Sequence, residues 1–208
     1  MSDSREVYPS IYNKLVYQFN LLNENYSKLL NIRVDFHYEL NQPENINKAY
    51  QDMVYLYHIF KSTHDGVIGC QFVMENSASG RLHIHALFFI NGQMHQKYYP
   101  FYCWLNDFWC RHTRGTSHTV DCNSAKNYKF AVVGSTKSYH DSSSVNGFIY
   151  LAKYFSKKEQ KENIPHFYRY FVSGINVKTS RGRPRVHAVN ILPLINDINL
   201  QLYSSLYY

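Results

Sequence analysis

The chain has 208 residues, of which 45% are hydrophobic and 18% charged, and its formal net charge is +7. These values are ordinary for a single folded domain, here expected over residues 1–208, and the excess of basic residues favours a polyanionic partner. The sequence holds no apolar run long enough to span a membrane, no secretion-signal pattern at its start and no CxxC pair among its four cysteines. We therefore expect a protein of the cytoplasm that does not contact a membrane and whose thiols are reduced.

Hydrophobic periodicity predicts helices and strands in alternation. The strand expected over residues 32–40 alternates strictly, so Ile32 and Val34 share one face while Arg33 and Asp35 share the other. A polar loop is expected over residues 135–144. The predicted helices span residues 9–31, 46–61, 98–111 and 145–158, and the predicted strands span residues 32–40, 67–75, 82–90 and, more weakly, 116–123 and 128–133.

The strand over residues 82–90 carries two histidines, His83 and His85, separated by one apolar residue. Side chains alternate along a strand, so both imidazoles point to the same face. Two imidazoles on one face of a rigid strand form half of a metal site. For a lone pair of histidines, a solvated sheet face would be the simpler interpretation.

A hairpin is predicted between this strand and the preceding one. If its loop is residues 78–80, with Gly80 in the left-handed conformation, Ser77 pairs with Arg81. That register places Glu75 directly opposite His83 on the same face. Glu75 is then a third candidate metal ligand, on the condition that this register is correct.

Two tyrosines lie one turn apart in the helix over residues 145–158. Tyr150 and Tyr154 share a helix face, with Lys153 beside them and Lys157 one turn further on. In a chain with 20 tyrosines, packing is the simpler role for such a pair. A tyrosine hydroxyl can also attack a DNA phosphodiester that a divalent metal ion polarises.

Together, these motifs resemble the HUH endonuclease superfamily, which comprises rolling-circle replication initiators, relaxases and single-strand transposases. His83-Ile84-His85 matches the family's histidine–hydrophobic–histidine motif, and Glu75 matches the acidic ligand upstream of it. Tyr150 with Lys153 matches the Tyr-x-x-Lys motif, and Tyr150 with Tyr154 matches the two-tyrosine form, most closely that of phage initiators. The match extends from about the first strand to the tyrosine helix and depends on the order of the motifs. The chain departs from the family where residues 33–35 replace a threonine-containing pattern.

The resemblance implies an α+β fold with a central antiparallel sheet of about five strands, flanking helices and the histidines on a central strand. It implies Mg²⁺ or Mn²⁺ held by Glu75, His83 and His85. Tyr150 would cut single-stranded DNA at a replication origin through a 5′-phosphotyrosine link, with Lys153 neutralising charge. Tyr154 would act as a second nucleophile.

Several basic residues are expected to contact DNA, and other proteins of a bacterial host are expected to complete replication. The sequence contains no phosphate-binding loop of a helicase, so a host helicase and polymerase are implied as partners of a monomeric nickase. The expected DNA contacts are Arg33, Lys157 and, in the basic segment over residues 178–185, Arg181, Arg183 and Arg185.

Three alternatives stay open at the level of sequence. The same chemistry could serve a transposase or a relaxase, which genomic context would distinguish. The chain could instead be an inactive relative that only binds single-stranded DNA through basic and aromatic side chains, although the histidines, Tyr150 and Lys153 are all intact. A zinc protein without nuclease activity is disfavoured, because no convincing fourth ligand is present.

Overall fold

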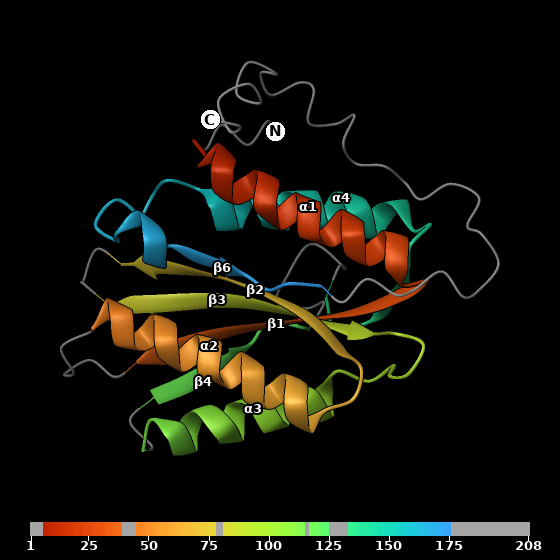
Figure 1. Ribbon diagram of the computed structural model, residues 1–208, viewed down its shortest axis with the longest axis horizontal. Coiled ribbons are helices and arrows are strands. Elements are labelled where there is room, and N and C mark those ends of the chain that lie inside the picture. The colour runs from red at the N-terminus through yellow and green to blue at the C-terminus, as the bar shows by residue number, and fades with distance from the viewer. Residues whose placement is uncertain (1–5, 39–44, 78–80, 115–116, 125–132, 176–208) are drawn as a thin grey trace.

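The computed structural model describes residues 6–38, 45–77, 81–114, 117–124 and 133–175. They form three layers, in which a sheet lies between two pairs of helices (Figure 1). Helices α1 (Pro9–Asn25) and α4 (Ser142–Ser156) cover one face, and α2 (Ile46–Thr63) and α3 (Tyr99–His112) cover the other (Figure 1). The expected α+β class, with a central antiparallel sheet and flanking helices, is confirmed.

In the described residues the sheet has six strands, in keeping with the sheet of about five that was expected. Five follow the order β4-β1-β3-β2-β6, β5 pairs with β1, and every pairing is antiparallel. The histidine strand, β3, is therefore central, as expected. A short 3₁₀ helix, η1 (His166–Tyr168), precedes the last strand. The strands are β1 (Lys28–Tyr38), β2 (Val67–Asn76), β3 (Leu82–Asn91), β4 (Ser117–Asp121), β5 (Thr136–Ser138) and β6 (Tyr170–Val172).

Aromatic rings fill the space between the sheet and the layer of α2 and α3. Phe36 of β1 meets Trp109 of α3 edge to face, with ring centroids 5.1 Å apart. Phe60 of α2 meets Phe88 of β3 in the same manner at 5.3 Å. These four side chains are fully buried. Burying an aromatic side chain of this size stabilises the fold by about 1.5–3 kcal/mol, so this face is held mainly by the hydrophobic effect.

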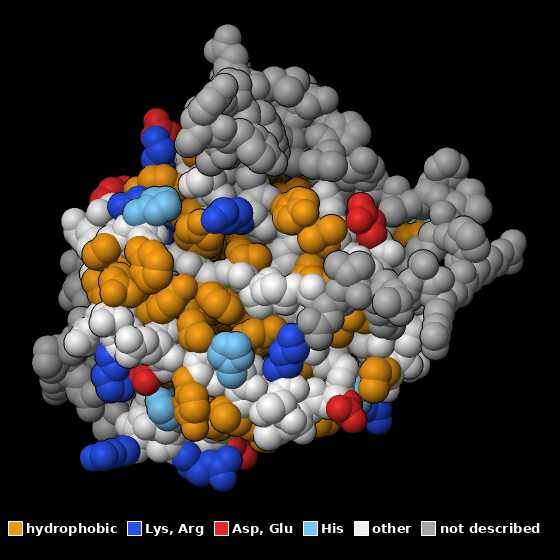
Figure 2. Space-filling view, in the orientation of Figure 1, with side chains coloured by type: hydrophobic (Ala, Val, Ile, Leu, Met, Phe, Trp, Pro, Cys, Tyr) orange, Lys and Arg blue, Asp and Glu red, His pale blue; other side chains and the backbone are white. Residues whose placement is uncertain are grey.

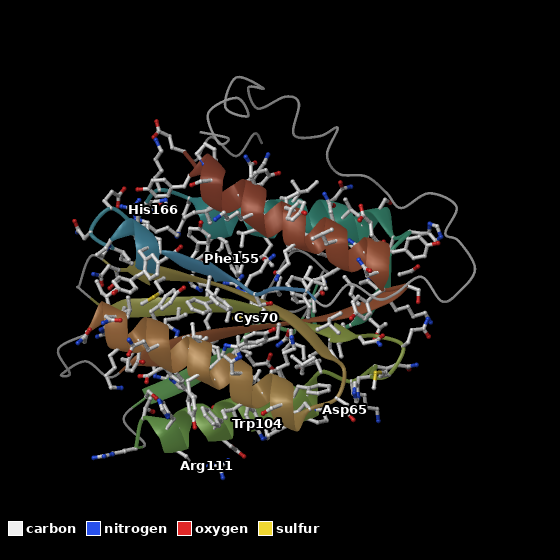
Figure 3. All side chains as sticks on the ribbon, viewed as in Figure 1. Asp65, Cys70, Trp104, Arg111, Phe155 and His166 are labelled. Atoms are coloured by element: carbon white, nitrogen blue, oxygen red, sulfur yellow. The ribbon has the colours of Figure 1, made fainter. Side chains whose placement is uncertain are left out.

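A second apolar core lies under α1 and α4. Phe19 of α1 stacks on Phe148 of α4, with ring centroids 3.9 Å apart. Phe155, near the end of α4, points toward the sheet (Figure 3). This core fixes α4 against the sheet and thereby fixes the position of the tyrosines that α4 carries.

Two predicted boundaries were wrong for identifiable reasons. The helix expected over residues 9–31 ends at Asn25, because Leu29 and Leu30 belong to β1. These two leucines are buried in opposite cores, so the doubly covered strand mimicked a helical pattern. The polar loop expected over residues 135–144 contains β5 and the first residues of α4, and the weak strand expected over residues 128–133 lies almost wholly outside the described residues.

The start of α4 shows why a polar sequence became a helix. The Asp141 side chain accepts hydrogen bonds from the backbone N–H groups of Ser143 and Ser144. Such a cap satisfies N–H groups that the first turn leaves without a partner. The aspartate and the serines after it are therefore helix-initiating residues, which composition alone presents as a loop.

The beginning of the described chain is fastened to the end of α4. The Tyr8 N–H donates to the Ser156 carbonyl at 2.7 Å, and Val7 forms an isolated antiparallel bridge with Lys157. The Lys158 N–H donates to the Glu6 carbonyl at 2.8 Å. Residues 6–8 therefore hold the chain in place where it leaves the tyrosine helix.

The face of the molecule seen in Figure 2 carries both basic and apolar side chains. Lys and Arg side chains are scattered over it rather than gathered in one patch, and apolar side chains reach the surface between them (Figure 2). Among the described residues, no helix combines the length and the apolar character needed to cross a membrane. The net charge of +7 therefore does not by itself mark a binding groove on this face.

Candidate active site

The histidines of β3 lie on the face that α1 and α4 cover. His85 is buried and His83 is half-buried, while Leu82 and Ile84 point into the opposite core. The strict alternation expected from the sequence is therefore observed. Because β3 is central, strands on both sides can supply partners to these two imidazoles.

The partners are set by strand register. Glu75 of β2 is directly opposite His83, and Asp35 of β1 is directly opposite His85. The Ser77 N–H donates to the Arg81 carbonyl at 2.8 Å, which is the pair expected at the end of the hairpin. The predicted register is confirmed, and it places a carboxylate on each side of the histidine strand.

His85 bridges the two carboxylates. Its Nδ1 lies 2.9 Å from Asp35 Oδ2, although the contact is not aligned as a straight hydrogen bond, and its Nε2 lies 3.2 Å from Glu75 Oε2. Burial favours the neutral imidazole, but the two carboxylates outweigh burial and raise the pKa of His85. The position of His85 between two carboxylates thus favours the protonated form of its imidazole.

Glu75 is the most heavily paired group of the site. Its Oε1 accepts a hydrogen bond from Lys161 Nζ at 2.5 Å, and its Oε2 lies 3.1 Å from Lys157 Nζ. Burial alone would raise the pKa of this carboxyl, but His85 and Lys161 outweigh burial and lower it to about 2. Glu75 is therefore ionised at neutral pH although almost no solvent reaches it.

Asp35 is held in a similar way by Arg33 of the same strand. The Arg33 guanidinium contacts both carboxylate oxygens, at 3.2 and 3.1 Å. Burial would raise the pKa of Asp35, but His85 and Arg33 hold it well below its usual range. Arg33 also lies over the rings of Tyr154 and Phe155, with its Cζ 5.2 and 5.5 Å from their centroids. Arg33, an expected DNA contact, is thus buried in the structure, where it holds Asp35 and lies over these two rings.

The tyrosine helix contacts the site through Tyr154. The Tyr154 ring meets the His85 ring edge to face, with centroids 5.6 Å apart. Tyr154 and Lys157 also have the Tyr-x-x-Lys spacing, and Lys157 Nζ lies 4.7 Å from the Tyr154 ring centroid. Burial and Glu75 together raise the pKa of Tyr154, so its phenol is neutral at pH 7.

Tyr150 lies one turn earlier in α4, farther from the helix end that Lys157 caps, and 37% of its surface is exposed. Lys153, which the sequence pairs with Tyr150, is half-buried on the same helix. The second tyrosine of the pair, Tyr154, is thus the one whose ring is seen to meet His85.

A row of histidines extends the site toward the edge of the sheet. His118 of β4, His37 of β1 and His83 of β3 are successive partners in register, and Glu75 follows on β2. The His37 ring lies 4.7 Å from that of His118 and 4.6 Å from that of His83. Burial, His83 and His118 together lower the pKa of His37 to about 4, so it is neutral at pH 7. The row leads from buried Glu75 to exposed His118, where this end of the sheet reaches solvent.

The side chains around His85 offer part of the donor set that Mg²⁺ or Mn²⁺, the ions implied by the resemblance, would need. Two ligand atoms that each lie about 2.1 Å from one ion are roughly 3.0–3.4 Å apart, and His85 Nε2 and Glu75 Oε2 are 3.2 Å apart. A carboxylate beside the other ring nitrogen, as Asp35 provides here, is the usual support of a metal-binding histidine. Within the described ranges, no three His, Cys, Asp or Glu side chains are already grouped as a metal site. The residues thus fit two ligands of a divalent ion, with His83 on the same face.

Some of these groups were missing from the sequence-based site. Asp35 was placed on the correct face of its strand, but nothing in the sequence indicated that β1 would lie beside β3. Lys161 follows α4 in a polar segment, and no sequence motif marked it as a residue of the site. The expected DNA contacts Arg181, Arg183 and Arg185 lie outside the described residues. No family model, curated protein sequence or solved structure matches the chain.

Proposed function

We propose that the protein is a metal-dependent enzyme that nicks and rejoins single-stranded DNA through a tyrosine. The observation that carries the proposal is the contact between the Tyr154 ring and His85, which in turn contacts Glu75. A neutral tyrosine held beside a histidine and a carboxylate supports nucleophilic attack at a metal-bound phosphate. Buried ion pairs of this kind seldom add stability, which favours a functional reason for them.

Tyr154 is the first nucleophile in this proposal. Its hydroxyl oxygen forms a bond to the phosphorus, and the bond from phosphorus to the 3′ oxygen breaks. The phenol loses its proton and the departing 3′ oxygen gains one, so the products are a 5′-phosphotyrosine and a free 3′-hydroxyl. The order of the two tyrosines is thus the reverse of that expected from the sequence, and Tyr150 becomes the second nucleophile.

The other side chains bind and orient. His83, His85 and Glu75 would hold Mg²⁺ or Mn²⁺, which supplies polarisation of the phosphate and offsets its developing charge. Lys157, at the end of the helix, would neutralise the phosphate or the leaving oxygen, the role that the sequence gave to Lys153. The row of histidines from His83 to His118 is a path by which a single strand reaches the site from the sheet edge.

The phosphotyrosine stores the energy of the cleaved bond, so the free 3′-hydroxyl can attack it and rejoin the strand without ATP. A free 3′-hydroxyl is also a primer, and initiation of rolling-circle replication in a bacterial cytoplasm is the use that we propose for it. A host helicase and a polymerase would extend the primer. Transposition or conjugative transfer would use the same chemistry on another DNA substrate.

The test is to trap the covalent intermediate. The full chain is incubated with a pool of single-stranded oligonucleotides and Mn²⁺, and the products are separated under denaturing conditions. We expect a protein–DNA adduct that chelator prevents and that peptide mapping by mass spectrometry places on Tyr154. An adduct on neither Tyr154 nor Tyr150, or the same yield in chelator, would contradict the proposed mechanism.

A further inference from the structure

Lys161 is a fully buried lysine that no part of the proposed chemistry uses. Its Nζ donates to Glu75 Oε1 at 2.5 Å. A buried ammonium is strongly disfavoured unless it is paired and hydrogen-bonded. Its presence beneath a candidate metal ligand therefore calls for a reason connected with that ligand.

The segment that carries Lys161 is built to bring it to this place. Gln160 adopts a left-handed backbone conformation, with φ of 67°, and its carbonyl accepts a hydrogen bond from the Asn76 N–H at 2.7 Å. The Lys161 N–H donates to the Lys158 carbonyl at 3.1 Å, which closes a turn directly after the tyrosine helix. A left-handed conformation is uncommon for a residue other than glycine. The turn thus fixes Lys161 against the end of β2, because Gln160 binds Asn76, the residue after Glu75.

The two lysines that contact Glu75 differ in what else they can reach. Lys157 binds Oε2, retains some exposure and lies beside the Tyr154 ring. Lys161 binds Oε1, and none of its surface is exposed, so it cannot contact DNA in this conformation. Lys161 therefore binds the carboxylate through Oε1, while Oε2 faces His85 and Lys157.

We propose that Lys161 is a positioning residue: it holds Glu75 by Oε1 so that Oε2 is presented to the divalent ion beside His85. This inference rests on the proposed function, because it assumes that Glu75 is a metal ligand. The same contact ties the turn after the tyrosine helix to the strand of that ligand. Lys161 thus links the position of the metal ligand to the position of the tyrosine helix.

The test measures Mn²⁺ binding to the full chain without DNA, by calorimetry, for the wild type and for Lys161→Met. Because residues that support metal ligands affect affinity by about 10- to 100-fold, we expect Lys161→Met to weaken Mn²⁺ binding at least tenfold. Lys158→Met is the matched control. Lys158 is three residues earlier in the same turn and pairs on the surface with Glu6, so its loss should leave Mn²⁺ affinity unchanged.

A third variant separates positioning from mere support of the fold. Lys161→Gln keeps an N–H donor for Oε1 but removes the charge, so it should bind Mn²⁺ more tightly than Lys161→Met. If Lys161→Met does not fold, the affinity of Lys161→Gln for Mn²⁺ is compared with that of the wild type instead. Thermal unfolding of each variant is measured beside the calorimetry. If the variants unfold at lower temperature but bind Mn²⁺ as the wild type does, Lys161 is structural only and the inference is overturned.

The two proposals fail in different ways. A wild-type protein that binds Mn²⁺ but never forms an adduct with DNA would overturn the proposed function, and the comparison of Lys161 variants would still be decided by Mn²⁺ affinity. A wild-type protein that forms the adduct while Lys161→Met binds Mn²⁺ normally would overturn only the role of Lys161.

Discussion

The two faces of the sheet are filled by different kinds of side chain. Under α2 and α3 the core consists of interlocking aromatic rings, whereas under α1 and α4 an apolar centre gives way at one end to buried ions. Apolar packing is what a chain needs to fold, while buried ions rarely improve stability over apolar groups of the same size. The difference supports the proposed function, in which the ionic end centred on His85 and Glu75 gives up some stability to form the reactive site.

The largest effect that would test this comparison is the loss of the nucleophile. Tyr154→Phe should slow adduct formation about 10⁴-fold, because Tyr154 is the proposed nucleophile and its ring meets that of His85. The rate is measured by denaturing electrophoresis with labelled DNA. Tyr150→Phe is the matched control on the same helix face, and it should keep the first cleavage within about tenfold of the wild type. If Tyr150→Phe were the variant that lost the adduct, the assignment of nucleophiles would return to the first Tyr-x-x-Lys match.

The aromatic face should respond to mutation in stability and not in chemistry. Phe60→Ala removes a fully buried ring that contacts Phe88 and Trp104, and it should lower the free energy of unfolding by about 3–5 kcal/mol. Urea denaturation measures the loss. Tyr55→Ala, on the same helix but 51% exposed, should cost less than about 1 kcal/mol. Nicking per folded molecule should be unchanged in both variants, and a specific loss of nicking in Phe60→Ala would break the division between the faces.

The smallest effect concerns a second set of ions, which lies on the aromatic face. Asp52 of α2 binds the Lys48 ammonium at 2.6 Å, the Tyr38 hydroxyl at 2.9 Å and His112 Nε2 at 2.9 Å. These contacts join α2 to β1 and α3. Because hydrogen bonds to charged groups contribute about 1.5–3 kcal/mol, Asp52→Asn, which keeps part of the network, should cost about 1–2 kcal/mol at pH 7.

The pH dependence of this loss has a definite sign. Burial opposes ionisation of Asp52, but Lys48 and His112 outweigh burial and lower its pKa. A carboxyl whose pKa is lower in the folded state stabilises the fold above its unfolded pKa, and this stabilisation disappears as the pH falls through the folded pKa. The difference in unfolding free energy between wild type and Asp52→Asn should therefore shrink in acid. A difference that grew in acid would contradict this account.

Local patterns predicted most of the fold. The strict alternation of β1 and β3 gave the correct faces, and the Ser77–Arg81 pairing gave the correct register of Glu75 and His83. The predicted ends of helices were wrong where the same residues are compatible with two kinds of structure. Leu29 and Leu30 are buried on both faces of a covered strand, which resembles a helix, and Asp141 begins a helix that its serine-rich surroundings hide.

The candidate site was harder to predict, because its parts come together only in three dimensions. Spacing along the chain identified His83, His85, Tyr154 and Lys157 as residues of interest. It favoured Tyr150 over Tyr154 as the first nucleophile, because the position at which the end of α4 meets the sheet cannot be read from spacing. It could not find Asp35 or Lys161 either, since the neighbours of β3 and the path of the turn after α4 are tertiary facts.

The bridge between Val7 and Lys157 has a consequence for biosynthesis. This bridge joins one of the first described residues to a late one, so the loop that it closes contains most of the chain. Such distant closure is slow and comes after local pairing, such as the hairpin of β2 and β3. A ribosome must therefore release the turn up to Lys161 before the end of α4, the candidate metal ligands and Tyr154 can come together. A nascent chain can pair β1, β2 and β3 early, but the proposed site can assemble only after this later turn has been made.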